Sequence, residues 1–290
     1  MLILFAVFLF ACQDTMGKYL VTSYSVPFVQ AIRYGVNLLL ITLIFTPRLG
    51  TSFMRTTRPF LAIMRGLALA LGSLTGGLAF RYLPLAEANS ILYLAPLLLL
   101  FLAKPVLGEQ VKWFGWVATA IGFAGLLFVV RPGGNLSSIG LVYAFLCLVT
   151  AVIYPLLSRL LAKTESTETL MFYVGLTGSV YYFAQLPWTW PQTFPPLQDF
   201  SLMVALGVVS LIGHSLFTAA YARAPVSLLA PFTYTHILWA VVFGWLVFNQ
   251  VPDALTFVGI ALVGLAGVGN AVLNHLSSSL PILDAEPQKV

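Results

Sequence analysis

The fold is decided by a stretch that the chain contains twice, "SILYLAPLLLLFLAKPVLGEQ" at residues 90–110 and "PFTYTHILWAVVFGWLVFNQ" at residues 231–250. Both are long apolar runs with a proline in the run or at its start, a tyrosine near the start and a short polar turn at the end. A helix that crosses a bilayer needs about 20 apolar residues, so each stretch has the length of one membrane span. The recurrence indicates an internal duplication of a membrane-spanning unit.

The composition places the whole chain in a lipid bilayer. Of the 290 residues, 60% are hydrophobic and 8% are charged, whereas a soluble domain has about 25% charged residues. A globule with so few charges could not cover its surface with polar groups, so an integral membrane protein is expected. The first run, "MLILFAVFLFAC", lacks the basic segment and cleavage site of a signal peptide, and we interpret it as the first span.

Apolar runs separated by turn segments predict an all-α membrane protein with ten transmembrane helices. Pro84 and Pro225 divide runs that nearly merge, since proline is favoured in the first turn of a helix. A count of nine spans is the alternative, and it would place the C-terminus outside. The ten predicted spans are 1–18, 26–46, 58–82, 84–106, 110–130, 136–161, 167–187, 198–222, 225–248 and 252–274.

Lys and Arg predict the orientation, because cytoplasmic segments carry an excess of them. With the N-terminus in the cytoplasm, three basic residues fall in outer segments, namely Lys18, Arg81 and Arg131. Nine fall in cytoplasmic segments: Arg48, Arg55, Arg58, Lys104, Lys112, Arg159, Lys163, Arg223 and Lys289. The prediction is a multi-pass protein of the inner (cytoplasmic) membrane with both termini in the cytoplasm.

Further matches extend the duplication over most of the chain. "FRYLP" ending at Pro84 corresponds to "YARAP" ending at Pro225, "IGFAG" to "VGLAG", and "GKYL" to "SRLL", with offsets of 141 or 142 residues. We therefore expect a first five-helix repeat at 1–132, a second at 133–276 and a disordered tail at 277–290. Because five is odd, the second copy enters the membrane from the opposite side, which gives an inverted-topology repeat typical of secondary transporters. A duplication retained for folding alone is the alternative.

This arrangement resembles the drug/metabolite transporter superfamily, and its EamA branch in particular. The resemblance covers nearly the whole chain and includes a Pro-containing fourth helix that ends in a Gly-Glu turn, here Pro96, Gly108 and Glu109. The second copy departs from this pattern, because it reads "FNQ" where the first reads "GEQ". Length and aromatic content are most similar to bacterial exporters of aromatic amino acids. The resemblance implies this fold and a transport role, and it defines the substrate only loosely.

Ionisable residues within apolar spans are costly and are therefore functional candidates. Asp14 and Lys18 are four residues apart on one helix face and are expected to pair, either as a structural ion pair or as a site of ion coupling. Glu87, in the first turn of the fourth span, suits either the helix dipole or coupling. Arg33 and Arg65 lie deeper in the second and third spans, where we expect them to connect helices rather than contact substrate.

The fourth and ninth spans are predicted to face a central, mostly apolar cavity, because a proline within a helix leaves a backbone carbonyl free. Aromatic rings there can stack on a planar substrate, and histidines can titrate or donate hydrogen bonds. Ordinary packing is the alternative for each of these side chains. The predicted substrate-binding residues are Tyr82, Asn89, Tyr93, His214, Tyr221, Tyr234, His236 and Trp239.

The sequence has no phosphate-binding loop, no Cys/His cluster and no paired carboxylates, so we expect no enzyme activity, no cofactor and no metal. We predict a secondary transporter that exports small organic metabolites, aromatic and other neutral amino acids first, by alternating access. A lipid flippase, a transporter of another metabolite, a channel and an intramembrane enzyme are the competing functions. The expected partners are a small-molecule substrate and the bilayer, without nucleic acid, for a monomer or weak homodimer.

Overall fold

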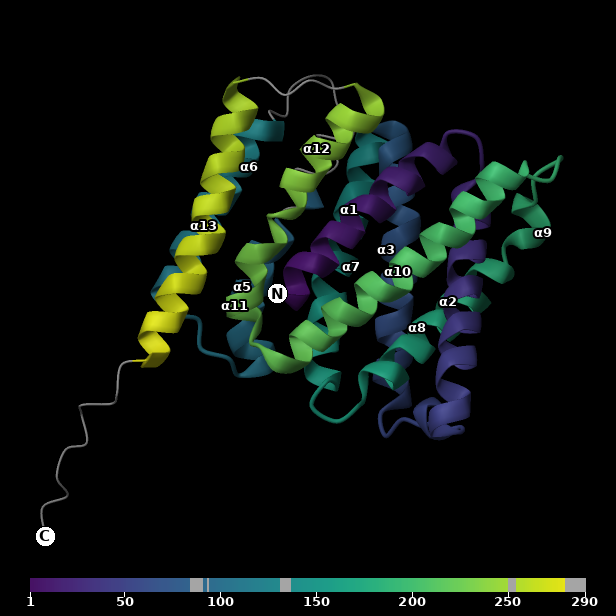
Figure 1. Ribbon diagram of the computed structural model, residues 1–290, viewed down its shortest axis with the longest axis horizontal. Coiled ribbons are helices and arrows are strands. Elements are labelled where there is room, and N and C mark those ends of the chain that lie inside the picture. The colour runs from purple at the N-terminus through teal and green to yellow at the C-terminus, as the bar shows by residue number, and fades with distance from the viewer. Residues whose placement is uncertain (84–90, 93, 131–136, 250–253, 280–290) are drawn as a thin grey trace, which may run out of the picture.

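The computed structural model describes residues 1–83, 91–92, 94–130, 137–249 and 254–279, and these residues contain helices and no β-strand (Figure 1). One short 3-10 helix, η1, covers Ser52–Met54. The α-helices are α1 (Leu2–Val21), α2 (Val26–Leu49), α3 (Pro59–Tyr82), α5 (Ala95–Leu107), α6 (Trp113–Val130), α7 (Ser138–Leu161), α8 (Thr167–Phe183), α9 (Leu186–Thr189), α10 (Leu197–Arg223), α11 (Val226–Thr233), α12 (His236–Phe248) and α13 (Ala254–Ser279).

Several helical segments have the length and composition of membrane spans. In the described part of the chain six qualify, namely Leu2–Val21, Val26–Leu49, Pro59–Tyr82, Ser138–Leu161, Leu197–Arg223 and Val226–Val247. Shorter apolar helices cover Ala95–Leu107, Trp113–Gly125 and Phe257–Ala266. The all-helical membrane class is therefore confirmed, and the full set of ten spans stays a prediction.

Local sequence signals explain where the helices begin. Pro59 is the first residue of α3, a position where the missing N–H costs no helical hydrogen bond. Ser137 and Ser166 precede α7 and α8, and their hydroxyls accept hydrogen bonds from the backbone N–H groups of Gly140 and Thr169. These starts lie within two residues of the predicted ones.

Two predicted spans are divided rather than continuous. The span predicted at 225–248 forms α11 and α12, which are separated at Tyr234 and Thr235. Around this break the backbone makes i to i+3 hydrogen bonds, for example from Leu238 N to Thr235 O at 3.1 Å. Pro231 lies one turn before the break, and a proline inside a helix favours such a distortion. The span predicted at 167–187 likewise forms α8 followed by the short helix α9.

The helices α5 and α12, which lie in the two similar stretches at residues 90–110 and 231–250, terminate in the same way. Gly108 follows α5 with a φ of 69°, and Asn249 follows α12 with a φ of 55°. Glycine adopts this left-handed conformation without strain, and asparagine is the next most common residue there. The replacement of Gly108 by Asn249 at the equivalent position therefore keeps the same helix termination.

The two halves of the chain are interleaved. The most extensive contacts join α3 to α7, α6 to α13, α1 to α10, α2 to α8, α3 to α8 and α2 to α10, and α5 also contacts α11. Each pair combines one helix from before residue 132 with one from after it. Figure 1 shows α6 and α13 together on one side of the molecule and α2 and α8 on the other.

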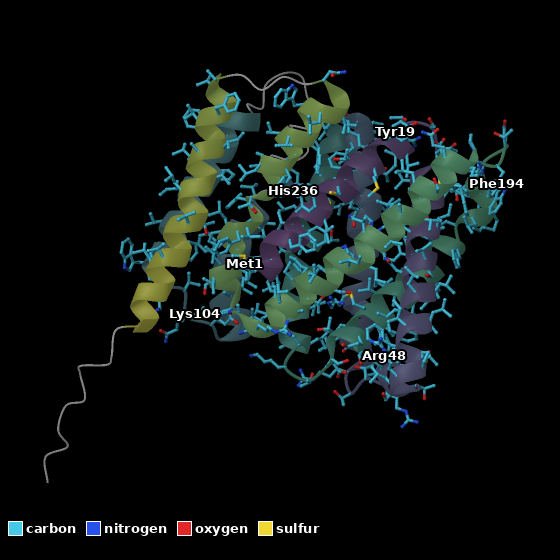
Figure 2. The ribbon with its side chains drawn as sticks, in the orientation of Figure 1. Met1, Tyr19, Arg48, Lys104, Phe194 and His236 are labelled. Atoms are coloured by element: carbon cyan, nitrogen blue, oxygen red, sulfur yellow. The ribbon has the colours of Figure 1, made fainter. Side chains whose placement is uncertain are left out.

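Glycines allow some of these helices to approach closely. A Cβ on Gly178 of α8 would overlap the ring of Tyr34 on α2, and one on Gly66 of α3 would overlap Thr177 on α8. Small residues at helix crossings are the usual device for close packing in membranes. The two ends of the bundle are marked in Figure 2, where Arg48 and Lys104 lie at one end and Tyr19 and Phe194 lie at the other.

Candidate functional site: a cavity between the two halves

A cavity of about 370 Å³ lies between the two halves of the chain. It is lined by α1, α2, α3, α5, α7, α10 and the junction of α11 with α12. Sites for small molecules have about 300–1,000 Å³, so this cavity has the size for a small metabolite. Its polar and aromatic lining residues are Phe10, Gln13, Asp14, Lys18, Gln30, Arg33, Ser73, Phe80, Thr150, Tyr154, His214, Phe217, Tyr221, Thr233 and His236.

Arg33 is buried in the cavity wall and is held by neutral groups. Its Nε donates a hydrogen bond to Ser210 Oγ at 2.8 Å, and its Nη1 donates to Gln30 Oε1 at 2.9 Å and to Ser73 Oγ at 3.2 Å. Its Nη2 lies 3.2 Å from His214 Nε2. Over the residues with described positions, no carboxylate forms an ion pair with this guanidinium.

A second arginine, Arg65, is fully buried beside the same cluster. Its Nη2 donates to Tyr154 Oη at 3.0 Å and to Thr218 Oγ1 at 2.6 Å. Its Nε donates to Ser158 Oγ at 2.8 Å, and its Nη1 donates to the backbone oxygen of Leu170 at 3.0 Å. These bonds connect α3 to α7, α8 and α10, and none of the acceptors carries a charge.

His214 contacts Arg33 directly and is linked to Arg65 through Tyr154, and the contact with Arg33 fixes its tautomer. Arginine is a donor only, so the His214 Nε2 that faces Arg33 must accept. The imidazole is then neutral, carries its proton on Nδ1 and donates to Tyr154 Oη at 3.2 Å. Tyr154 Oη therefore accepts from His214 and from Arg65, and the structure gives its own hydroxyl proton no acceptor among the described residues.

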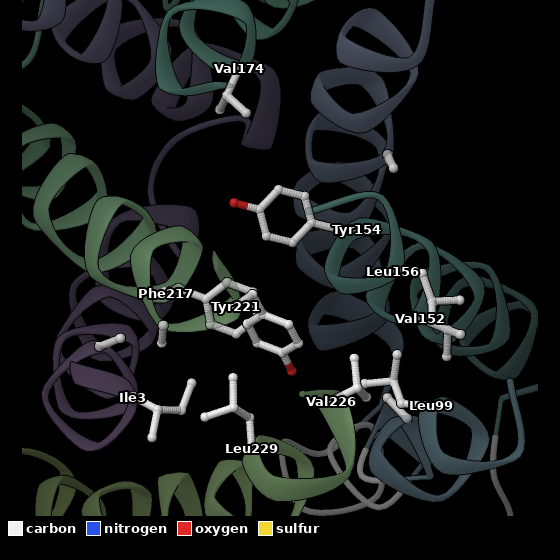
Figure 3. Close-up of a cluster of buried hydrophobic side chains, with 14 of the residues drawn as sticks. Ile3, Leu99, Val152, Tyr154, Leu156, Val174, Phe217, Tyr221, Val226 and Leu229 are labelled. Carbon is white, nitrogen blue, oxygen red and sulfur yellow. The ribbon is translucent and has the colours of Figure 1, made fainter. Parts of the chain in front are cut away.

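Aromatic rings form the wall next to this cluster. The ring centroids of Phe10 and His214 are 4.7 Å apart, those of Tyr154 and Phe217 are 5.8 Å apart, and those of Phe217 and Tyr221 are 4.5 Å apart. Figure 3 shows Tyr154, Phe217 and Tyr221 within the buried cluster. Such offset or tilted rings present an apolar surface on which a planar group can pack.

A titratable pair lies on another side of the cavity. Asp14 Oδ2 is 3.2 Å from His236 Nε2, and both residues line the cavity. His236 is the first residue of α12, just after the break that divides the ninth predicted span. Figure 2 places His236 between the two ends of the molecule. The predicted partner of Asp14, Lys18, also lines the cavity.

An ion pair lies just beyond the cavity lining, where Arg159 Nη1 also donates to the backbone oxygen of the lining residue Tyr221 at 2.9 Å. Glu109 Oε1 accepts a hydrogen bond from Arg159 Nε at 2.6 Å, and Glu109 Oε2 accepts one from the backbone N–H of Val226 at 2.8 Å. These residues lie where α5 and α7 finish and where α11 begins. The cavity lining extends in the other direction, to Val21 and Phe80 near the ends of α1 and α3. The Glu109–Arg159 ion pair therefore connects helices at the end opposite to the one toward which the cavity extends.

The predicted site residues divide into three groups. Asp14, Lys18, His214, Tyr221 and His236 line the cavity. Asn89, Tyr93 and Glu87 lie outside the described residues. Three others do not line this cavity: Tyr82 is half exposed and stacks on Tyr143, Tyr234 is buried against Gly122 of α6, and Trp239 packs edge-on against Phe8. These three face neighbouring helices, and sequence alone does not give that orientation.

Four cavity residues were not predicted from the sequence as part of the site, namely Arg33, Tyr154, Phe10 and Phe217. Arg33 had a usable signal, since an arginine in the middle of an apolar span is a functional candidate by default. The phenylalanines had none, because the chain contains 22 of them and most positions suit packing. The sequence marks Glu109 only as part of the turn after the fourth predicted span. Its contact with Arg159 could not be predicted, because it depends on how α5 and α7 pack.

Comparison with known families adds to this geometry. The model of the EamA-like transporter family matches residues 1–131 and 138–270. The chain belongs to the EamA-like transporter family. The two matched stretches of this EamA-like chain meet near the predicted junction of its repeats, so a duplicated architecture is supported independently of the quoted motifs.

Relatives of this EamA-like protein are transporters of different metabolites. The chain is 25% identical to an S-adenosylmethionine uptake transporter of Rickettsia bellii, over 87% of this chain and 86% of that protein. It is 26% identical to a pseudopaline exporter of Pseudomonas aeruginosa, over 92% and 93%, and to a riboflavin transporter of Rhizobium johnstonii, over 88% and 84%. One solved crystal structure superposes with a TM-score of 0.81 at 18% identity, covering 94% of this chain and 96% of that chain, and shares the fold.

Proposed function

We propose that this protein is a secondary transporter that moves a small organic metabolite across the inner membrane by alternating access. The observation that carries the proposal is the cavity, which both halves of the chain line and which ends near the Glu109–Arg159 ion pair. A carrier needs a site that opens to one side at a time, and contacts between interleaved halves can be exchanged to achieve this. Membership of the EamA-like transporter family agrees with this role.

We further propose ten transmembrane helices in two inverted repeats, 1–132 and 133–276, with both termini in the cytoplasm. The helix contacts support this arrangement, because exchanging the repeats converts the α1–α10 pair into the α7–α3 pair and the α3–α8 pair into the α10–α2 pair, and leaves α2–α8 and α6–α13 unchanged. The left-handed residues Gly108 and Asn249 also occupy equivalent positions, 141 residues apart. The interruption between α11 and α12 lies at the cavity, and interrupted helices commonly mark the binding site of such transporters.

The proposed substrate is an aromatic or another neutral amino acid, which the protein exports. An amino acid carries one positive and one negative group, and the cavity offers Asp14 and Arg33 to them. The rings of Phe10, Phe217 and Tyr221 supply a surface for an aromatic side chain. Proton coupling through Asp14 and His236 belongs to the same proposal, as does a monomer or weak homodimer.

The test is uptake into liposomes that contain the purified protein. Labelled amino acids are supplied singly, with and without a pH gradient. Saturable uptake of phenylalanine, tyrosine or tryptophan, absent from protein-free liposomes, is expected. Folded protein that moves no amino acid, but transfers a labelled phospholipid between leaflets, would contradict the amino acid proposal and favour a flippase.

A further inference from the structure

We infer that the cavity holds a binding site for the carboxylate of the transported molecule at the guanidinium of Arg33, beside His214. This inference rests on the proposed transport function and specifies the chemical group that the transporter recognises. It assigns a substrate contact to Arg33, which was predicted from the sequence only to connect helices.

The positive charge of the buried arginines favours an anionic ligand. Two buried guanidinium groups lie at the ends of one hydrogen-bonded chain, from Arg33 through His214 and Tyr154 to Arg65. All of their acceptors are neutral, and a buried charge is unfavourable unless an opposite charge compensates it. Among the described cavity residues the carboxylate is that of Asp14, which contacts His236. An anionic group entering the cavity would supply the missing compensation.

The direction of the hydrogen bonds favours a ligand that accepts them. A guanidinium has five N–H donors, and Arg33 uses four of them for the partners described above. Its remaining N–H is on Nη2, next to the imidazole. Tyr154 Oη already accepts two hydrogen bonds, so its own proton is also available on the other side of that imidazole. The cluster therefore has unused donors, and a ligand that binds there must accept hydrogen bonds.

The charge at Arg33 distinguishes between anions. A carboxylate carries one negative charge, which matches the single charge of the guanidinium, and its oxygen can accept the unused N–H of Arg33. A phosphate group has more charge and more oxygens than this guanidinium satisfies. The adjacent rings of Phe10 and Phe217 are apolar and suit the hydrocarbon part of a small organic acid. The site therefore selects a carboxylate attached to an aromatic or aliphatic group.

The experiment compares carboxylates with their amides on the wild-type protein. In liposomes, L-phenylalanine and 3-phenylpropionate are expected to inhibit uptake of labelled L-phenylalanine. L-Phenylalaninamide and 3-phenylpropionamide are expected to inhibit about 10-fold less well or worse, because an amide lacks the charge of the carboxylate. The same four compounds are added to the protein in detergent, where the carboxylates are expected to raise Tm more than the amides do.

Variants then identify the contacts. Arg33→Gln is expected to abolish the preference for the carboxylates, and Arg33→Lys to restore only part of it, since lysine keeps the charge but not the geometry. Tyr154→Phe is expected to keep the preference, because the Tyr154 hydroxyl lies on the other side of His214 from Arg33 and one carboxylate does not reach both. Matched controls are Arg48→Gln on the same helix as Arg33, and Tyr143→Phe on the same helix as Tyr154. Arg48 is exposed, and neither control residue lines the cavity.

The outcomes separate this inference from the function on which it rests. Uptake of phenylalanine with equal inhibition by acids and amides would overturn the carboxylate site and leave transport standing. Absence of amino acid uptake, with carboxylates that raise Tm in the wild type but not in Arg33→Gln, would support the site and contradict the amino acid substrate. Absence of both uptake and any Arg33-dependent rise in Tm would overturn both. The comparison within the wild type decides the matter if Arg33→Gln does not fold.

Discussion

Glu109 and Arg159 lie 50 positions apart, on opposite sides of the junction between the repeats, and their side chains meet at 2.6 Å. The second carboxylate oxygen of Glu109 accepts the first backbone N–H of α11, from Val226. One side chain therefore joins the ends of α5, α7 and α11. Any conformation in which the cavity opens at this end must break these contacts, so the ion pair stabilises the present conformation relative to that one.

Glu109→Gln is expected to increase access to the cavity from the end that holds the ion pair. Loss of a hydrogen bond to a charged group costs about 1.5–3 kcal/mol, which shifts the equilibrium by roughly 10- to 150-fold. The measurement is the rate at which an impermeant thiol reagent labels Cys147, which lines the cavity, in a Cys12→Ala background. Glu165→Gln is the control, because Glu165 is half-buried and accepts hydrogen bonds from Thr57 but does not line the cavity. Equal labelling rates from that side in both variants would argue against the role of the ion pair.

Asp14→Asn and His236→Gln test proton coupling. The two side chains form a titratable contact of 3.2 Å within the cavity, so a proton that moves with the substrate is expected to use them. Uptake should respond to a pH gradient in the wild type and not in either variant. Full retention of the gradient response in both variants would mean that proton coupling uses other groups.

Tyr221→Phe separates binding from folding. The Tyr221 hydroxyl is buried in the cavity wall and has no hydrogen-bond partner among the described residues. Its removal should leave Tm unchanged, because no hydrogen bond within the protein is lost. If the hydroxyl binds substrate, KM should rise by about 2- to 13-fold, the equivalent of about 0.5–1.5 kcal/mol.

Tyr182→Phe is the matched comparison for Tyr221→Phe. Tyr182 is equally buried, but its hydroxyl donates to the backbone oxygen of Ala70 at 2.7 Å. This variant should lower the free energy of unfolding by about 0.5–1.5 kcal/mol and leave KM unchanged. A larger loss of stability in Tyr221→Phe than in Tyr182→Phe would contradict the assignment of the Tyr221 hydroxyl to substrate.

Gly178→Val tests the close crossing of α2 and α8. The added side chain would overlap the ring of Tyr34, so the helices must separate. Overpacking of this kind lowers the free energy of unfolding by about 1–3 kcal/mol, which a lower Tm in detergent would reveal. Gly264→Ala is the control, because no atom lies within 4 Å of its added Cβ. Unchanged Tm in Gly178→Val would show that the crossing can relax.

Tyr24 and Asp199 predict a change of stability at high pH. Tyr24 lies between α1 and α2, and its hydroxyl donates to Asp199 Oδ2 at 2.6 Å. This hydrogen bond, together with desolvation, raises the pKa of Tyr24 from 10.0 to about 12. The protonated form is the one stabilised by folding, so the contribution is complete below pH 10 and is lost as pH rises through about 12. The Tm difference between wild type and Tyr24→Phe should therefore disappear over this range, whereas a constant difference would contradict it.

The sequence was sufficient for the class of the fold and for most helix boundaries. Apolar runs of the right length and signals such as Pro59 and Ser166 act locally, so they can be read without the tertiary structure. The break at Tyr234 and Thr235 was not predicted, because it depends on how the backbone around Pro231 is satisfied by its surroundings. A proline within an apolar span indicates a distortion but does not fix its form.

The candidate site was predictable only in part, because the rotation of each helix is set by partners in the other half of the chain. His214, Tyr221 and His236 turn toward the cavity, whereas Tyr234 turns toward α6. All four looked equivalent as polar or aromatic residues in apolar spans. Their orientations follow from the pairing of helices between the two halves, and no short-range pattern records that pairing.

The uncompensated guanidinium of Arg33 has an electrical consequence. A membrane voltage acts on any charge that is displaced through the bilayer, with about 2.3 kcal/mol for a unit charge crossing 100 mV. If switching of the empty carrier moves Arg33 through part of this field, the rate of that step depends on voltage. Once a carboxylate neutralises the guanidinium, the same movement carries no net charge at this site. The return of the empty carrier, rather than passage of the cargo, would then be the step that the cell's membrane potential drives or resists.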